Sequence, residues 1–231
     1  MTKRYNLIDF LRGFTLIHMI IYHLIFDLEN FYGFSFNFNF YYYQQYICMS
    51  FIFLAGLCEN FSGQRLKRIL ILGLAAGIIT IGSFIFDKTY AIYFGILHFF
   101  FLSGLIFYGF SKFFKIKNTS LAFFISLSLF IIFKGLEEGN ILFGLVKIPQ
   151  NFYTYNLFVL GLPGPTFKSG DYFPIIPWIF LYFSGFFSYK FFKLTKKEPA
   201  HNIFNIMGRH SLIVYLIHQG VLVGLLNLFL G

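Results

Sequence analysis

The sequence predicts an all-α protein, a polytopic membrane helix bundle with about seven transmembrane helices plus a re-entrant or interfacial segment. The 231 residues are 58% hydrophobic, with a mean hydropathy of +0.71. Only 12% are charged, where a soluble domain carries about 25%. The apolar residues gather in runs long enough to cross a bilayer, and basic residues cluster between the runs. We expect a single transmembrane domain over residues 1–231.

Each predicted span is a mostly apolar segment of suitable length. The first follows Lys3 and Arg4 and lacks a small-residue cleavage site, so we expect it to stay as a span rather than to be removed as a signal peptide. The spans are expected at about 7–28, 44–62, 68–87, 91–111, 119–135, 173–192 and 207–229.

The long connection 136–172 breaks the regular pattern. It is rich in Gly, Pro and Asn, and its two apolar stretches are too short or too interrupted to span. We interpret it as an outward-facing re-entrant or interfacial cap. A further span here would invert everything that follows and place the basic loop 190–209 outside, against the positive-inside rule.

The basic residues predict the orientation. The net charge is +9, but no basic helix with interleaved aromatics appears, which argues against a nucleic-acid partner. Of the 18 Lys and Arg residues, 14 fall on one side of the predicted bundle. The N-terminus is therefore expected in the cytosol and the C-terminus outside an integral, multi-pass cell-membrane protein. The 14 are Lys3, Arg4, Arg12, Arg65, Lys67, Arg68, Lys112, Lys115, Lys117, Lys190, Lys193, Lys196, Lys197 and Arg209.

A polar stripe runs along the first span. At about 100° per residue, Asp9, Arg12, His23 and Asp27 fall within one arc of roughly 100°, and His18 lies on the opposite face. Ionisable groups at membrane depth are costly in lipid, so this stripe should face the bundle interior or a water-filled cavity.

The polar residues of this stripe suggest two functional roles. His23 and Asp27 have the spacing of a general base whose imidazole is held by a carboxylate; a simple interhelical hydrogen bond of His23 is the alternative. Asp9 and Arg12, near the cytosolic end, either hold an anionic ligand or form a helix-end ion pair with Arg12 reaching the headgroups.

Polar residues elsewhere extend the candidate site. His98 is expected about two turns into the fourth span from outside, and "GDYFPIIPW" places Asp171 and Trp178 at the outer mouth of the sixth. Trp178 also suits an interface anchor. "GRHSLIVYLIHQG" opens the seventh span with Arg209 and Ser211 and buries His218 deeper. Several histidines at membrane depth favour a polar cavity.

No metal site is expected. The sequence lacks H-E-x-x-H, Cys-x-x-Cys and close His-x-His spacings. Cys48 and Cys58 are interpreted as buried small residues.

The segments that contain these polar residues resemble those of a known protein family. In order, "IDFLRGFTLIHMIIYHLIFDL", "FIFLAG", "IYFGILHFFFLSGL", "DYFPIIPWIFLYFSG" and "GRHSLIVYLIHQ" resemble the bacterial membrane proteins related to the catalytic domain of heparan-α-glucosaminide N-acetyltransferase. The resemblance covers residues 4 to 220 and implies transfer of an acyl group, typically acetyl, from cytosolic acyl-CoA to a sugar hydroxyl or amine on the far side.

The resemblance also implies roles. Asp9 and Arg12 match the D-x-x-R-G signature at the cytosolic end, and His23 matches the histidine of the wider acyltransferase pattern. In the heparan enzyme the catalytic histidine is attributed to the first external loop, whereas residues 24–97 contain no histidine here. The base would then be His23 oriented by Asp27, or else His98.

Donor and acceptor sites follow from the same interpretation. Arg12, Arg65, Lys67, Arg68 and Arg209, with Asp9 and Ser211, are expected to bind the coenzyme at the cytosolic rim. Asp171, Trp178 and His218 are expected near the acceptor, a carbohydrate or envelope glycan.

Two other functions stay open. A transporter or channel for a small polar solute or proton would use the same histidines as a relay. A non-catalytic partner of envelope enzymes is the third, and a homo-oligomer is compatible with all three.

Overall fold

The structure, a computed structural model, describes residues 3–114 and 116–230. Lys115, one of the basic residues counted for orientation, lies outside the described residues. The described chain is all-α apart from one pair of two-residue strands, as predicted. It divides into two compact units, Met1–Leu54 with Lys193–Gly231, and Ala55–Phe192. Whether they act as one transmembrane domain stays a prediction.

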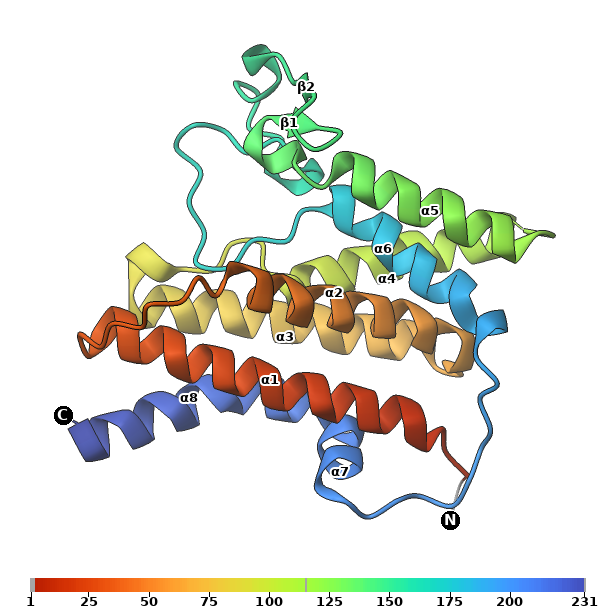
Figure 1. Cartoon of the computed structure of the whole chain (residues 1–231), viewed down its shortest axis with the longest axis horizontal. Coiled ribbons are helices and arrows are strands. Elements are labelled where there is room, and N and C mark those ends of the chain that lie inside the picture. Colours follow the sequence, from red (N-terminus) through yellow and green to blue (C-terminus); the bar gives the residue numbers. More distant parts are fainter. Residues whose placement is uncertain (1–2, 115, 231) are drawn as a thin grey trace. The chain divides into compact units, whose positions relative to one another are not determined.

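In the first unit, α7 (Ile203–Arg209) and α8 (Ser211–Leu230) pack along α1 (Asn6–Phe31), as Figure 1 shows. Glycines permit the crossing of α1 and α7. A Cβ added at Gly13 would lie 1.8 Å from the Phe204 carbonyl oxygen, and one at Gly208 would lie 1.8 Å from that of Asp9. The two backbones are therefore in direct contact, as small residues allow in membrane helices.

The α2 helix (Tyr41–Cys58) starts in the first unit and ends in the second. Within the first unit, Ile47 joins Leu16 and Met19 of α1 in a buried apolar cluster. His18 hydrogen-bonds through Nδ1 to the Tyr43 hydroxyl at 2.7 Å. His18, which was expected on the face of the first span opposite the polar stripe, thus helps to hold α1 against α2.

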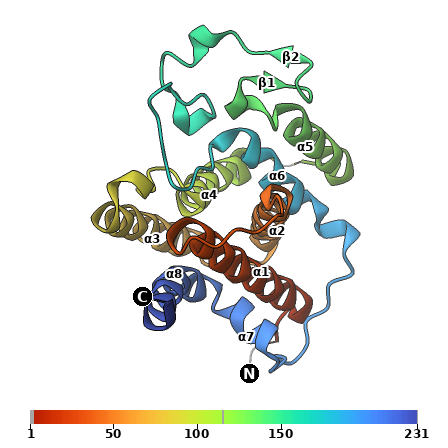
Figure 2. The same ribbon diagram turned by 60° about the vertical axis from the view of Figure 1, so that its left-hand side comes forward.

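The second unit contains two helix pairs. The first is α3 (Arg65–Phe86) with α4 (Ile96–Phe113), and the second is α5 (Thr119–Phe133) with α6 (Ile175–Phe187), which lie side by side in Figure 2. The connections contain 3-10 turns at Glu59–Phe61, Lys88–Tyr90, Leu136–Glu138, Gln150–Phe152, Phe158–Leu160 and Ser188–Phe191.

The connection 136–172 holds only short elements. Its strands β1 (Asn140–Ile141) and β2 (Val146–Lys147) pair antiparallel, and short 3-10 turns follow. It contains no helix long enough to span a membrane, which agrees with the interpretation as a cap. Its side relative to the membrane stays a prediction.

Five helical stretches are long and apolar enough to cross a membrane: α1, α3, α4, α8 and Thr119–Glu138. The predicted count of seven is therefore not confirmed. The expected spans at 44–62 and 173–192 do form helices, α2 and α6, but neither is among these five. The α2 helix begins with the polar run "YYYQQY". The 13 residues of α6 cover about 20 Å, short of a hydrocarbon core of about 30 Å.

Lipid contact accounts for the exposed side of α3. Leu74, Ile78, Ile81 and Ile85 are 63–77% exposed and follow one another at helical spacing. A contiguous apolar face of this size is unfavourable in water. The chain is a multi-pass membrane protein.

Candidate functional site

The polar stripe of α1 finds its partners outside α1. Asp9 is almost fully buried and pairs with Arg4, whose Nε lies 2.8 Å from Oδ2 and whose Nη2 lies 3.1 Å from Oδ1. Arg12 instead donates to the Ser211 hydroxyl at the start of α8. The ion pair expected as one alternative between Asp9 and Arg12 is thus replaced by one with Arg4.

Two residues expected at the cytosolic coenzyme site, Arg12 and Ser211, are therefore brought together. A third, Arg209, donates to the Ala200 carbonyl at 2.7 Å. This bond connects the end of α7 to the segment before α7, and it uses one of the hydrogen-bond donors of the Arg209 guanidinium.

A second cluster lies farther along α1 and α8. Asp27 has no exposed surface, and both its oxygens accept hydrogen bonds from Gln219 Nε2 at 2.9 Å. The hydrogen bonds described for Asp27 come from Gln219 and not from His23. The expected orientation of His23 by Asp27 is therefore absent from this arrangement.

His23 instead faces a second histidine. Its ring centroid lies 4.9 Å from that of His218. The Nδ1 of His218 is 2.5 Å from the Tyr215 carbonyl oxygen, which can only accept, so Nδ1 carries the proton. In a neutral ring, Nε2 then holds the lone pair. This atom is buried and has no hydrogen-bond partner among the described residues.

The α1–α8 cluster, defined here as His23, Asp27, His218 and Gln219, contains a second unsatisfied atom. The Gln219 Oε1 is also buried without a described partner. Buried polar atoms are nearly always satisfied, so two orphaned acceptors in one cluster indicate an incoming donor such as a hydroxyl, an amine or water. Sequence reasoning found both histidines and Asp27, but no local signal paired Gln219 with Asp27.

His98 has both ring nitrogens engaged. Nδ1 accepts from the Gly95 backbone N–H at 3.3 Å, and Nε2 lies 3.1 Å from the Thr80 hydroxyl. Since that hydroxyl donates to the Ile92 carbonyl at 2.8 Å, Nε2 is the donor to Thr80. The ring thus secures the first turn of α4 against α3.

Asp171 secures the same turn. Its Oδ2 accepts from the Ile96 backbone N–H at 3.1 Å. Burial raises the pKa of this carboxyl from 3.8 to about 6, while hydrogen bonds from the Ile96 and Tyr172 backbones act in the opposite direction. The residue expected near the acceptor is therefore fixed at the start of α4.

Trp178 lies inside the second unit rather than at an interface. It is 2% exposed, packs against Phe130 and Phe173, and has the Lys134 ammonium 4.8 Å from its ring centroid. Its indole N–H is buried without a described partner.

The arginines at the start of α3 surround a buried glutamate. Glu59 is 1% exposed and accepts hydrogen bonds from Arg68 and from the Tyr182 hydroxyl. Arg65 Nε lies 3.6 Å from the same carboxylate, and its Nη2 donates to the Glu59 carbonyl at 3.1 Å. Both arginines expected to bind coenzyme are thus partly neutralised, and nothing in the sequence pattern indicated Glu59 as their partner.

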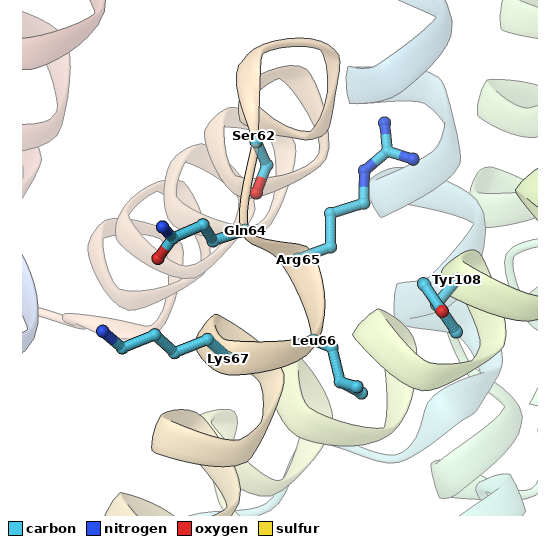
Figure 3. Close-up of a pocket in the computed structure, with 7 residues that line it drawn as sticks. Ser62, Gln64, Arg65, Leu66, Lys67 and Tyr108 are labelled. Carbon is cyan, nitrogen blue, oxygen red and sulfur yellow. The ribbon is translucent and has the colours of Figure 1, made fainter.

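A pocket of about 380 Å³ opens beside this glutamate network. Figure 3 shows Gln64 and Lys67 extending to one side of the loop and Arg65 to the other. The backbone N–H groups of the first turn of α3 have no intrahelical acceptor, and Gln64 at the N-cap provides no side-chain cap. The pocket is lined by Ser62, Gly63, Gln64, Arg65, Leu66, Lys67 and Tyr108.

Among the described residues, no group of three or more His, Cys, Asp or Glu side chains is arranged to hold a metal ion.

The fold and the α1–α8 cluster define a class: a multi-pass helical membrane protein with buried, incompletely satisfied histidine and amide groups. The model of the family described as heparan-alpha-glucosaminide N-acetyltransferase, catalytic, matches residues 4–220. The chain belongs to this family of membrane acetyltransferases, which confirms the resemblance seen in the sequence. No curated protein and no solved structure matches the chain.

Proposed function

We propose that the chain transfers an acetyl group from cytosolic acetyl-CoA to a sugar hydroxyl or amine on the extracytoplasmic side of the membrane. The observation that carries this proposal is the family match over residues 4–220. The α1–α8 cluster supports it, because acyl transfer requires a group that accepts the acceptor's proton within a site shielded from bulk water.

The proposed base is the histidine pair. His23 and His218 lie ring to ring, and the lone pair on His218 Nε2 is held in place by the bond between Nδ1 and the Tyr215 carbonyl. A hydroxyl or amine that attacks the thioester carbonyl gives its proton to this pair. The carbon–sulfur bond breaks as the new bond to the acceptor oxygen or nitrogen forms. The CoA thiolate leaves with the proton that the histidine pair took up, which returns the pair to its neutral state.

Asp27 and Gln219 are assigned a supporting role. The buried carboxylate places negative charge one helical turn from His23 and fixes the Gln219 amide. This charge stabilises the imidazolium that forms during transfer. The orphaned Gln219 Oε1 is left to accept a hydrogen bond from the acceptor.

The proposed donor site is the pocket at the start of α3. Lys67 and Gln64 extend beside N–H groups that the helix leaves unpaired, and such helix starts favour phosphate groups. Arg65 adds positive charge, although Glu59 neutralises part of it. This combination of groups suits the phosphates of the coenzyme better than Arg68 does, because Arg68 is engaged with Glu59.

Two measurements test the proposal on the purified full chain. Incubation with labelled acetyl-CoA and glucosamine should release CoA thiol and label the amine. Calorimetric titration with CoA should show binding that Lys67→Gln weakens about fivefold, the value of one exposed charge pair of about 1 kcal/mol. Lys117→Gln, at another exposed lysine, should bind as the parent does. Folded protein that neither binds CoA nor transfers acetyl would refute the proposal.

A further inference from the structure

The two histidines of the α1–α8 cluster have the separation of two ligands of one metal ion. Two imidazoles that bind one tetrahedral Zn²⁺ ion through nitrogen, at about 2.0–2.1 Å each, have ring centroids about 5 Å apart. The ring centroids of His23 and His218 lie 4.9 Å apart, and the ring planes are inclined by 56° rather than stacked face to face. Both residues belong to the first unit, on helices that pack along each other (Figure 1).

The His218 ring is held in the way that metal-binding histidines are held. Such a histidine usually donates one ring N–H to a backbone carbonyl or a carboxylate, which fixes the ring and leaves the other nitrogen for the metal. The Nδ1 of His218 makes this bond to the Tyr215 carbonyl at 2.5 Å. The residue is 8% exposed, and its Nε2 has no hydrogen-bond partner among the described residues. This nitrogen therefore presents an oriented lone pair to a ligand.

His23 and Gln219 supply further donor atoms. The His23 ring forms no hydrogen bond within residues 3–114 and 116–230, so a ring nitrogen is available. The Gln219 Oε1 is buried without a described partner, while its Nε2 is fixed by the bonds to Asp27. The negative charge of the buried Asp27 carboxylate also offsets part of the charge of a divalent cation.

The chemistry of these donors selects one class of ion. Imidazole nitrogen suits Zn²⁺, Cu²⁺ and Ni²⁺, whereas Mg²⁺ and Ca²⁺ prefer oxygen ligands. A catalytic zinc site has three protein ligands in most enzymes. Two imidazoles are fewer, so we expect reversible binding of an ion from solution rather than a resident cofactor. The two histidines lie on different helices, and for this reason no metal-binding motif in the sequence joins them.

We propose that the α1–α8 cluster binds one Zn²⁺ ion through His23 and His218, and that the bound ion blocks acetyl transfer. The Gln219 Oε1 and water complete the coordination. A nitrogen lone pair that coordinates the ion cannot accept the proton of an attacking hydroxyl or amine. The block rests on the proposed function, since it assigns a metal inhibitor to the proposed base. The binding itself does not.

Calorimetric titration of the tag-free full chain in micelles tests the binding. The parent should bind one Zn²⁺ ion per chain, and Mg²⁺ should give no binding. His23→Gln and His218→Gln should each weaken Zn²⁺ binding by more than about a hundredfold, since losing a residue that only orients a ligand already costs about 10- to 100-fold. His201→Gln and His210→Gln, at exposed histidines outside the cluster, should bind Zn²⁺ as the parent does.

A measurement on the parent alone covers the case in which a histidine variant fails to fold. Cu²⁺ uses the same imidazole ligands. With one equivalent of Cu²⁺, the electron paramagnetic resonance spectrum of the parent should show coupling to two nitrogen nuclei. A spectrum without nitrogen coupling, or Zn²⁺ binding that folded His23→Gln and His218→Gln chains retain in full, overturns the inference.

The block is measured separately, in the acetyl-transfer assay. The Zn²⁺ concentration that halves the rate should match the calorimetric dissociation constant, and excess EDTA should restore the rate. Full-rate transfer by the Zn²⁺-saturated parent overturns the block. The binding measurements contain neither CoA nor acceptor. Histidine-dependent Zn²⁺ binding in a chain without transferase activity would therefore refute the proposed function alone.

Discussion

The Gln219 side chain on α8 donates to both carboxylate oxygens of Asp27 on α1, at 2.9 Å each, and Asp27 has no exposed surface. This contact joins helices separated by nearly the whole chain. It also fixes the side chains that flank the two facing histidines.

Replacing Gln219 by Leu should therefore destabilise the fold. The buried carboxylate of Asp27 would lose its described donor, at a cost of about 1–3 kcal/mol. The double variant Asp27→Leu/Gln219→Leu should recover part of that loss, because no unsatisfied group remains. Unfolding titrations in micelles compare four chains: the parent, Gln219→Leu, Asp27→Leu and the double variant. A double variant whose loss of stability equals the sum of the two single losses would contradict the pairing.

The histidines should act as one unit in transfer. His23→Gln and His218→Gln are each expected to lower the rate of acetyl transfer by about 10²- to 10⁴-fold, the usual contribution of a general base. The double variant should lose little more than either single variant. His201→Gln, at an exposed histidine outside the cluster, is the control. Full activity in both single variants would remove the histidine pair from the mechanism.

Because the backbones of α1 and α7 are in direct contact at Gly13, a larger residue there should strongly lower the stability of the fold. A methyl group there would meet the Phe204 carbonyl at 1.8 Å, which backbone atoms relieve only by moving apart. Gly13→Ala should lower the free energy of unfolding by at least about 1–3 kcal/mol. A Cβ at Gly220 on α8 meets nothing within 4 Å, so Gly220→Ala should be neutral or slightly stabilising. Equal melting temperatures for the two variants would contradict the α1–α7 contact.

Glu59 should be necessary for the fold of the second unit. Glu59→Ala leaves the Arg68 guanidinium and the buried Tyr182 hydroxyl without their common acceptor. Because the Arg68 side chain is 35% exposed and can be hydrated, we expect a loss of about 1–3 kcal/mol. Glu198→Ala, at an exposed glutamate, should change stability by less than about 0.5 kcal/mol. Chemical unfolding of both variants gives the comparison, and similar small losses would argue against the network.

Asp171 should make stability depend on pH. Its pKa is raised by burial from 3.8 to about 6, so the folded chain binds a proton more tightly than the unfolded chain. The resulting stabilisation is fully present below about pH 4 and is lost as pH rises through 6. Asp171→Asn keeps an oxygen acceptor for Ile96 and should flatten the melting temperature between pH 4 and 6. A parallel pH profile in both chains would contradict the assignment.

Helix positions followed from apolar run length, because that signal is local. The expected fourth span at 91–111 began too early, since α4 starts at Ile96. The preceding residues are extended because Ala91 and Phe94 pair with the segment around Gly170 and Phe173. Such pairing between distant segments leaves no trace in the hydropathy pattern.

The candidate site was likewise predictable only where the pattern is local. Spacing along α1 placed His23 and Asp27 on one polar face of the helix, but spacing alone favoured a bond between them. The observed partners, His218 and Gln219, lie almost 200 residues away on α8. Likewise, Asp9 pairs with Arg4 because the chain before α1 is held by a bridge between Arg4 and Lys197.

The most direct test of transmembrane transfer uses sealed proteoliposomes with labelled acetyl-CoA enclosed and glucosamine outside. We expect acetylated glucosamine to accumulate outside while CoA thiol appears only in the lumen. The His23→Gln/His218→Gln chain should show neither. Folded parent protein that leaves the external amine unlabelled, with or without acetyl-CoA hydrolysis inside, would contradict transfer across the membrane by this chain.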